Sequence, residues 1–490
     1  MDMRSGRGLL VAGLLTLAVA TGCSTETRLA AALPAATATA PAVHYVGSLT
    51  LSPDHGTAGT TVIVQAQGLP ASTPLSVVWK TANGSWVLTG AQHEIFSGRS
   101  FATVMKPMGT ATSDAAGNFS LSFQAPQDFG FAHDVIVQTQ AGDVVNKGSF
   151  TLLPQFSISP TSGPAGTPIT VTLDGVGYQY LYNSWFLEYD NKFTGWLSSV
   201  TTHGLAVAVV PATGAPGPHS LTSIEGAFTY PYINTQQSPA PKPTFAATFT
   251  VTGGTPVLPP PGPSQGFAPQ PGVAPGGTAP AVWSDPQSAP VGQSAVLHGR
   301  GFPAGAPVQV TWGRVVGNRV GGSGWDEATA PLGTATAAAD GTWSLPYTVP
   351  DDLGGTHALT ATASGTQPVT GSFTLTTSAF AITPASGPVG TPIHIHLKGG
   401  GWTATANIYM VVYDNATVGY VCAFNSQGDV QLNMVAAGEP GYHYIDLYPA
   451  IYNGTDVQGV DDFRLPQLTF AQDHPGEHLP AFHFAFQVTQ

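Results

Sequence analysis

The chain has little charge. Asp, Glu, Lys and Arg together make up 8% of its 490 residues, whereas a typical soluble domain has about 25%. This shortage argues against a helical cytosolic protein, because exposed helix faces need lysine and glutamate. Acidic residues outnumber basic ones by 27 to 14, for a formal net charge of −13, and no basic stripe is present. The sequence therefore lacks the electrostatic footprint of a nucleic-acid-binding protein.

Cysteine is nearly absent too, with only Cys23 and Cys422 in the chain. Cys23 lies in an N-terminal motif, described below, that implies modification of its thiol. If Cys23 is modified, no internal disulfide can form, and stability must come from hydrophobic cores and chain length. Cys422 lies in the strand-like run 420–424. We expect it to be a small buried hydrophobic residue.

Glycine (59) and proline (43) are abundant, and 42% of the residues are hydrophobic. This hydrophobic fraction is enough to form cores, which argues against a disordered chain. Turn-forming residues around short apolar runs predict many strands.

Residues 1–22 have the pattern of a secretory signal peptide. Arg4 and Arg7 precede an uninterrupted apolar run at residues 9–20, which is too short to span a bilayer. The run leads into Ala20-Thr21-Gly22-Cys23, which resembles the lipobox of bacterial lipoproteins, although that family usually has leucine in the place of Ala20.

The lipobox resemblance implies that the thiol of Cys23 is acylated and that Cys23 becomes the new N-terminus. Residues 23–44 then form a flexible Ala/Pro/Thr tether. The alternative is an ordinary secreted protein that is cleaved nearby.

Four segments begin alike, with a proline, one or two nearby glycines and then a strand-like run. Their prolines are Pro53, Pro160, Pro286 and Pro384. The second and fourth segments correspond at a constant offset of 224 residues, and the first and third at 224 or, further upstream, 233. The chain is therefore a duplicated two-module unit, with the order A-B-A′-B′.

The repeats predict the domain organisation. The predicted parts are module A at 45–154, module B at 155–253, a Pro/Gly-rich linker at 254–280, module A′ at 281–378, and module B′ at 379–490. Each module holds about 100 residues with short strands and regular turn signals, as expected for a β-sandwich. The linker composition favours an extended, semi-rigid segment.

Residues 156–173 followed by Gly175-Val-Gly-Tyr178, and residues 380–397 followed by 399–402, look like the opening of the immunoglobulin-like fold known as IPT/TIG. Modules A and A′ resemble the broader bacterial immunoglobulin-like repeats in their hairpins at 113–119 and 338–343. The resemblance implies an all-β fold of four tandem immunoglobulin-like β-sandwiches. It implies no particular function, because such sandwiches carry unrelated activities.

The candidate ligand-binding residues are aromatic and belong to module B. Residues 178–196 hold eight aromatic side chains, four of which align with aromatic residues of module B′ and are expected in the core. The other four align with Ala404, Ala406, Met410 and Thr417; they are Tyr180, Tyr182, Phe186 and Phe193. The shared fold does not require them, so an exposed aromatic face could stack on sugar rings or anchor an interface. Alternatively, they fill a larger core or pack against a neighbouring module.

The candidate metal ligands are the three histidines of the segment 473–483. These are His474, His478 and His483, next to Asp473 and Glu477. Imidazole and carboxylate groups at short spacing can bind zinc or a similar ion. The alternative is a Pro/Gly loop that uses histidine as an uncharged polar residue. We predict no cofactor.

The dipeptides Asp190-Asn191 and Asp414-Asn415 occupy equivalent places in modules B and B′. Their oxygens could seat calcium, but Asp-Asn is more simply the turn of a hairpin.

We find no nucleophile elbow, zinc-protease motif, phosphate loop or dinucleotide fingerprint in the sequence. We therefore predict a non-catalytic lipoprotein of the bacterial cell surface that acts as a structural, adhesive or binding scaffold. Its partners would be the membrane, through the lipid, and a protein or glycan ligand, but no nucleic acid. The alternatives are a carbohydrate-binding envelope protein that uses the module B aromatics, and a secreted hydrolase whose carboxylates come from distant loops.

Overall fold

The computed structural model describes residues 44–89, 95–179, 182–226, 230–237, 244–318, 324–452 and 464–490. The predicted signal peptide, Cys23 and all of the tether except His44 lie outside the described residues. The elements within these ranges are strands and three short 3₁₀ helices, η1 (Thr235–Gln237), η2 (Gly262–Ser264) and η3 (Phe424–Ser426). No helix in the described ranges is long and apolar enough to cross a membrane.

Module A consists of a three-stranded and a five-stranded sheet. Their strand orders are β1-β3-β6 and β2-β8-β7-β4-β5. The strands are β1 (Ser48–Ser52), β2 (His55–Gly56), β3 (Thr61–Gln67), β4 (Pro74–Thr89), β5 (Ile95–Thr112), β6 (Phe119–Gln124), β7 (Phe131–Thr139) and β8 (Val144–Leu152). Every second residue of β3 is buried, as expected for a strand with one face toward a core.

Module B has the same two sheets, with the orders β9-β11-β14 and β10-β16-β15-β12-β13. The strands are β9 (Gln155–Ser159), β10 (Ser162–Pro164), β11 (Pro168–Asp174), β12 (Trp185–Tyr189), β13 (Lys192–Leu197), β14 (Ala206–Pro211), β15 (Gly217–Glu225) and β16 (Phe245–Thr252). The side chains of β11 alternate between buried and partly exposed, as the apolar–polar alternation of residues 169–173 predicts.

Module A′ repeats the plan with β17-β19-β22 and β18-β24-β23-β20-β21. The strands are β17 (Ala281–Asp285), β18 (Ser288–Pro290), β19 (Ser294–Arg300), β20 (Pro307–Asn318), β21 (Gly324–Thr336), β22 (Trp343–Thr348), β23 (Gly355–Thr362) and β24 (Val369–Thr376).

Module B′ repeats the plan of two sheets, with the strand orders β25-β27-β30 and β26-β32-β31-β28-β29. The strands are β25 (Ser378–Ala379), β26 (Ser386–Gly387), β27 (Pro392–Lys398), β28 (Ile408–Tyr413), β29 (Ala416–Cys422), β30 (Val430–Val435), β31 (Gly441–Ala450) and β32 (Phe482–Val488). The strand β25 begins at Ser378, one residue before the predicted start of module B′. The predicted borders between modules stay predictions.

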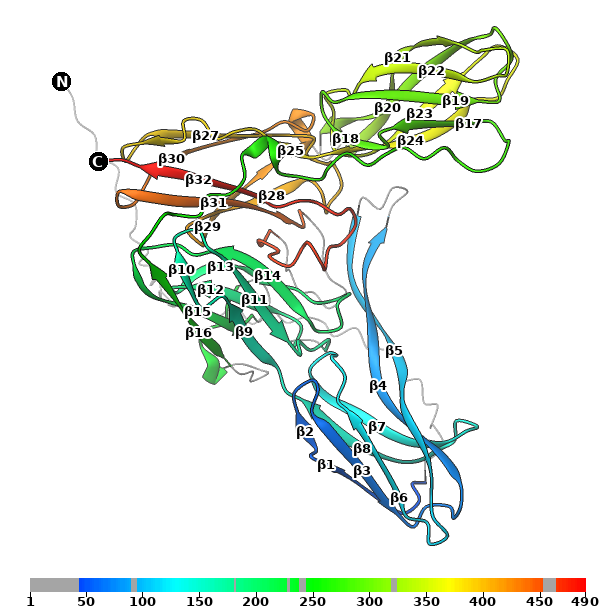
Figure 1. Ribbon diagram of the computed structural model, residues 1–490, viewed down its shortest axis with the longest axis vertical. Helices are drawn as coiled ribbons and strands as arrows, with labels where there is room; N and C mark the ends of the chain where they lie inside the picture. Colours follow the sequence, from blue (N-terminus) through cyan, green and yellow to red (C-terminus); the bar gives the residue numbers. More distant parts are fainter. Residues whose placement is uncertain are drawn as a thin grey trace, which may run out of the picture. The chain divides into compact units, whose positions relative to one another are not determined.

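All four sheet pairs share one topology, and Figure 1 shows them following one another along the chain. Each pair encloses its own hydrophobic cluster, with a buried aromatic residue such as Trp79, Trp185, Trp312 or Tyr409. The predicted fold class, all-β with tandem immunoglobulin-like sandwiches, is therefore confirmed. The shared glycine that follows each opening proline adopts φ of about +80°, which a tight turn requires; these are Gly59, Gly166, Gly292 and Gly390.

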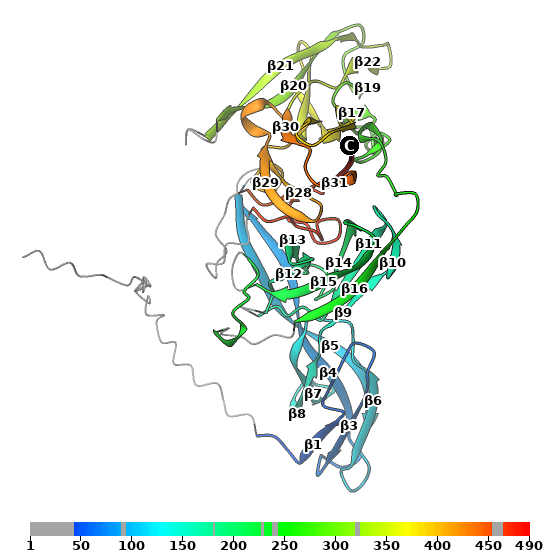
Figure 2. The same cartoon turned by 90° about the vertical axis from the view of Figure 1, so that its left-hand side faces the viewer.

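Two strands of module A continue beyond its sheet. The strand β4 pairs with β7 only over Leu75–Trp79, but it pairs with β5 from Pro74 as far as Thr89. The remainder is a two-stranded ribbon, visible as the long blue arrows of Figure 1 and again from the side in Figure 2.

The linker 254–280 contains the short helix η2 and is held by hydrogen bonds to modules B and B′. Its Val257 N–H donates to the Ala165 carbonyl at 2.8 Å, and the Tyr444 hydroxyl donates to the Val257 carbonyl at 3.0 Å. The Gln265 side chain bonds both the N–H and the carbonyl of His483. This part of the linker is therefore fixed in place.

Candidate functional site

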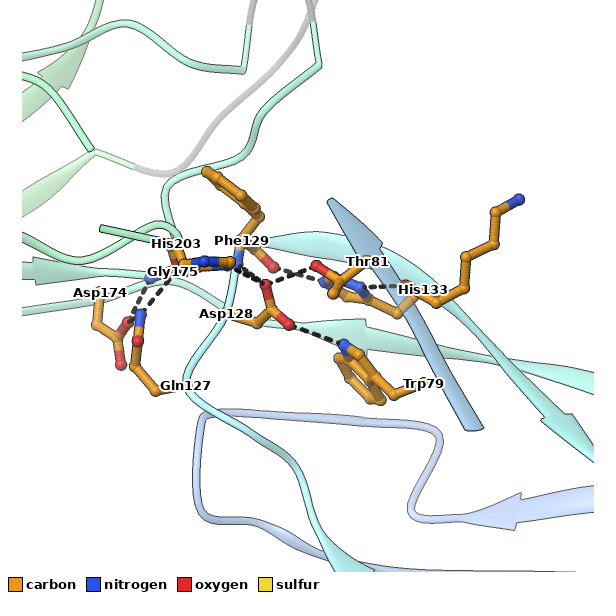
Figure 3. Close-up of polar contacts among 10 residues, drawn as sticks. Trp79, Thr81, Gln127, Asp128, Phe129, His133, Asp174, Gly175 and His203 are labelled. Atoms are coloured by element: carbon orange, nitrogen blue, oxygen red, sulfur yellow. Dashed lines mark hydrogen bonds and ion pairs between the residues drawn. The ribbon is translucent and has the colours of Figure 1, made fainter. Parts of the chain in front are cut away.

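The contacts between modules A and B centre on Asp128, which follows module A's strand β6 and is 1% exposed. Its carboxylate accepts hydrogen bonds from Trp79 Nε1 at 3.1 Å, Thr81 Oγ1 at 2.6 Å and the Phe129 N–H at 2.9 Å. From module B, His203 Nδ1 approaches Asp128 Oδ1 to 3.8 Å. Figure 3 shows these side chains converging from both modules. Hydrogen bonds of this kind are what make a buried carboxylate tolerable.

The imidazole of His133 completes this cluster. Its ring stacks on the Trp79 indole with centroids 4.3 Å apart. The two ring nitrogens face the carbonyls of Lys80 at 3.0 Å and Phe129 at 2.5 Å. His133 therefore ties the start of the ribbon to the segment that leads into β7 of module A (Figure 3).

The same cluster recurs between modules A′ and B′ around Asp352, which is also 1% exposed. Asp352 accepts from Trp312 Nε1 at 3.0 Å, the Leu353 N–H at 2.9 Å and Gln427 Nε2 at 2.5 Å. The His357 ring stacks on Trp312 with centroids 4.3 Å apart. The duplication predicted from the sequence therefore extends to the contacts between modules.

The backbones of adjoining modules also meet directly. The Gly130 N–H donates to the Val176 carbonyl at 3.1 Å, and the Gly354 N–H donates to the Gly400 carbonyl at 2.9 Å. A Cβ at Gly130 would lie 1.9 Å from the Gly175 carbonyl oxygen, and one at Gly354 would lie 2.0 Å from the matching oxygen of Gly399. Only glycine fits at these two positions.

One exposed pair differs between the two junctions. In the first, Gln127 Nε2 donates to Asp174 Oδ1 at 3.2 Å, and burial raises the pKa of Asp174 although the Gln127 hydrogen bond partly offsets this. At the equivalent positions of the second, Lys398 forms an ion pair with Asp351. The hydrogen bond to Asp351 raises the pKa of Lys398. Acceptor and donor have changed sides, but the link is kept.

A second kind of junction joins modules A, B and B′ through one hydrophobic cluster, which we call the three-module core. Its buried residues are Phe96, Phe186, Trp196, Ile224, Ala404, Ile451 and Leu465, with Trp86, Leu88 and Phe193 packed against them. The ribbon supplies Trp86, whose ring meets that of Trp196 edge to face at 5.8 Å. This core makes the ribbon part of the contact with modules B and B′.

A buried carboxylate, Asp473, lies beside the three-module core and is fully buried. It accepts hydrogen bonds from Trp86 Nε1 at 3.0 Å, the Val200 N–H at 2.7 Å and the Thr201 N–H at 2.8 Å. The Thr201 hydroxyl donates to it at 2.8 Å. One side chain of module B′ thus bonds both module A and module B.

The segment 466–468 of module B′ adds backbone pairing to module B. The Trp196 N–H donates to the Pro466 carbonyl at 2.7 Å, and the Leu468 N–H donates back to the Trp196 carbonyl at 3.0 Å. These bonds lie along β13, the edge strand of its sheet. An edge that could pair with another chain is here covered by the protein itself.

The predicted exposed aromatic face of module B is wrong at Phe186, which is fully buried in the three-module core. Phe193 is half-buried and lies between Phe186 and Tyr230, with centroids 5.6 and 5.4 Å away. Tyr182 packs on Phe131 of module A at 4.3 Å. These residues follow the alternative interpretation, packing against neighbouring modules, while Tyr180 lies outside the described residues.

Two further predictions need correction. Cys422 is exposed, because it ends the edge strand β29 and its side chain falls on the outer face. Tyr420 shares that face and is 49% exposed, although its alignment with Trp196 predicts a core position. Trp196 is buried because both the ribbon of module A and module B′ cover module B there. The repeat therefore preserves the strand but not its neighbours.

The structure does not bring the three candidate metal ligands together. His474 and His478 stack with centroids 4.7 Å apart, whereas His483 Nδ1 hydrogen-bonds Asp446 Oδ1 at 2.7 Å. Burial lowers the pKa of His478, and the charge of His474 lowers it further. Within the described ranges, no three His, Cys, Asp or Glu side chains are placed to share a metal ion.

The Asp-Asn dipeptides form the turns of hairpins. Asp190, Asn191, Asp414 and Asn415 all have positive φ, as the tight hairpin turn requires. The side chain of Asp190 bonds His219 Nδ1 at 2.6 Å, and Asp414 bonds His443 Nδ1 at the same distance. These carboxylates hold their own module together.

Asp128 and Asp352, the centres of the two equivalent junctions, are not among the residues predicted from the sequence. A signal for them exists, because both are separated by the same 224 residues as the other repeated positions. Asp473 was considered only as a neighbour of metal ligands. Its partners Trp86, Val200 and Thr201 are distant in sequence, so no local pattern points to it.

No protein-family model and no curated protein matches the chain. Among solved structures, it is similar to a mutant α-2-macroglobulin from Salmonella at 10% identity and a TM-score of 0.18, over 91% of this chain and 31% of that one. It is also similar to the native α-2-macroglobulin of E. coli, at 10% identity and a TM-score of 0.18, over 91% of this chain and 32% of that one. A D1–D4 ectodomain fragment of ICAM-5 is similar at 12% identity and a TM-score of 0.20, over 90% of this chain and 99% of that one. The chain spans about a third of the two macroglobulins. At these scores the similarities carry no argument about function.

Proposed function

We propose that this protein is a non-catalytic extracytoplasmic scaffold whose sandwich modules are held in a fixed arrangement to present a binding surface. One observation carries the proposal, namely that buried carboxylates bond across module borders. Asp473 of module B′ is fully buried and bonds modules A and B. Buried Asp352 of module A′ accepts from Gln427 of module B′, and His203 of module B approaches buried Asp128 of module A to 3.8 Å. Burying such charges costs free energy unless every bond is made, so separate modules on free linkers would not need them.

Small-angle X-ray scattering of the mature chain in solution tests this proposal. A single rigid arrangement should account for the scattering curve. A curve that requires a broad distribution of module positions would contradict a fixed scaffold.

The proposed location is the outer face of a bacterial membrane, with the lipid on Cys23 as anchor. Support comes from the sequence alone, through the apolar run 9–20 and the lipobox-like residues around Cys23. The substitution Cys23→Ala should move the protein from the membrane fraction to the medium, as seen by immunoblot of both fractions. Cys422→Ala is the matched control and should leave the protein in the membrane fraction. Retention of the Cys23→Ala protein in the membrane fraction would contradict the anchor.

Carbohydrate binding in the cell envelope is the second candidate function, and the pair Phe193–Tyr230 favours it. Tyr230 is 60% exposed and its ring contacts Phe193 edge to face. Exposed aromatic rings stack on sugars. Binding on a glycan array should be lost in Tyr230→Ala and kept in Tyr45→Ala, which removes an exposed tyrosine of module A. Equal binding by both variants would remove this candidate.

A further inference from the structure

A hollow of about 170 Å³ lies where module B, the linker and module B′ meet. Most of its lining is apolar and comes from Pro168, Val209, Val210, Pro211, Val257, Leu258, Pro259 and Pro260. Module B′ contributes Tyr444, Asp446 and His483. An apolar pocket with a few convergent polar groups is the usual form of a small-molecule site.

The carboxylate of Asp446 is the unusual feature of this hollow. Asp446 is 2% exposed, and its Oδ1 accepts a hydrogen bond from His483 Nδ1 at 2.7 Å. Its Oδ2 has no hydrogen-bond partner within the described part of the chain. A buried carboxylate with one oxygen unpaired carries a poorly compensated negative charge, which favours a cation in the hollow beside it.

The shared fold does not require this pair. Asp446 stands opposite His483 in the pairing of β31 with β32. At the equivalent place in module B, where β15 pairs with β16, Thr222 stands opposite Ala246. The same sandwich therefore forms without either ionisable group, and the Asp446–His483 pair belongs to module B′ alone.

His483 also borders a second hollow, of about 260 Å³, which is lined by the linker and module B′. Leu258, Pro259 and Pro260 line both hollows. The linker is held at this point by Val257 and Gln265. A ligand would therefore meet a wall that is already in place, which limits the entropy cost of binding.

We propose that the hollow binds a small organic ammonium ion, whose charged group lies next to the Asp446–His483 pair. The apolar body of the ligand contacts Val209, Val257 and Leu258. The carboxylate selects a cation, because an anion would be repelled by Asp446 and a neutral ligand would gain nothing from its charge. The ring of Tyr444, which lines the same hollow, can add a cation–π contact.

The test uses benzylammonium as the probe on the mature chain, followed by ligand-observed NMR and calorimetry. Benzyl alcohol and benzoate have the same ring with a neutral and a negative group. We expect benzylammonium to bind and the other two to bind much more weakly. Failure of benzylammonium to bind, or equal binding by benzoate or benzyl alcohol, would overturn the proposal.

The variant that carries both Asp446→Thr and His483→Ala supplies the matched control, because it restores the residues that module B has at these places. It should keep its thermal unfolding temperature and weaken benzylammonium binding about thirtyfold or more, as expected when one partner of a buried charged contact is lost. Asp446→Asn keeps the shape of the side chain and should weaken binding similarly. It replaces the double variant if that protein does not fold. His394→Ala, on an exposed position of β27, should bind as the unchanged protein does. Full binding by Asp446→Asn would count against the site.

Discussion

At the residue scale, several of the chain's few charged side chains are buried and hold neighbouring strands or modules together. Only 8% of the residues are charged, yet Asp128, Asp352, Asp446 and Asp473 are all buried. All but Asp446 have both oxygens paired or approached by donors from neighbouring strands or modules. A carboxylate with several hydrogen bonds has one favoured geometry, which apolar packing alone does not impose.

The same scale predicts a pH dependence at His443. Its Nδ1 lies 2.6 Å from Asp414 Oδ2 and its Nε2 lies 2.8 Å from the Glu439 carbonyl. The hydrogen bond to Asp414 raises the pKa of His443 above its ordinary value of 6.5, although burial opposes this. The folded protein therefore binds this proton more tightly than the unfolded chain does. Its stabilising effect is complete below pH 6.5 and is lost as the pH rises through the raised pKa.

Thermal unfolding of the unchanged protein and of His443→Gln, from about pH 5.5 to about pH 8.5, checks this prediction. The difference in Tm between the two proteins should be largest at the acid end and shrink as the pH rises. His394→Gln serves as a control, since His394 is exposed. A difference that grows with pH would contradict the assigned sign.

At the scale of elements, each junction depends on close approach of two loops. A Cβ added at Gly130 or Gly354 would lie 1.9 or 2.0 Å from a backbone carbonyl oxygen, far inside van der Waals contact. Neither position can therefore accept a side chain without a shift of the backbone. Gly130→Ala should therefore separate modules A and B without unfolding either one. Gly354→Ala should do the same for modules A′ and B′.

Hydrogen exchange followed by mass spectrometry measures this effect. Faster exchange is expected around residues 128–133 and 174–177 in Gly130→Ala, with the strand interiors of both modules unchanged. Gly253→Ala is the control, because no atom lies within 4 Å of its added Cβ. Unchanged exchange at the junction would show that the contact tolerates a side chain.

At the scale of the whole molecule, the ribbon of β4 and β5 connects module A with modules B and B′. Trp86 donates to Asp473 at 3.0 Å and packs on Trp196 at 5.8 Å. Trp86→Ala removes a donor from a fully buried carboxylate and leaves a void in the three-module core. We expect about 2 kcal/mol of destabilisation and a larger radius of gyration by small-angle scattering.

Met105→Ala is the matched control for the ribbon, because Met105 lies on β5 and is 49% exposed. It should leave both the unfolding temperature and the scattering curve unchanged. If Trp86→Ala lowered stability but left the radius of gyration as it was, the ribbon would not be what holds the modules together.

The fold class and the repeat can be predicted from the amino-acid sequence. Alternation of apolar and polar residues, the proline–glycine openings and the constant offset of 224 residues are local or periodic signals, so they predict strands and turns without knowledge of their neighbours. The same comparison identified Phe186 and Phe193 as residues that the shared sandwich does not need.

The role of those extra residues depends on contacts that form only in the folded protein. Phe186 is buried because it packs in the three-module core with side chains of the ribbon and of module B′. Cys422 is exposed because β29 is an edge strand. Contacts between residues hundreds of positions apart, such as Trp86 with Asp473, leave no periodic trace in a single chain. Strand formation depends on nearest neighbours, whereas burial at a junction depends on which surfaces meet.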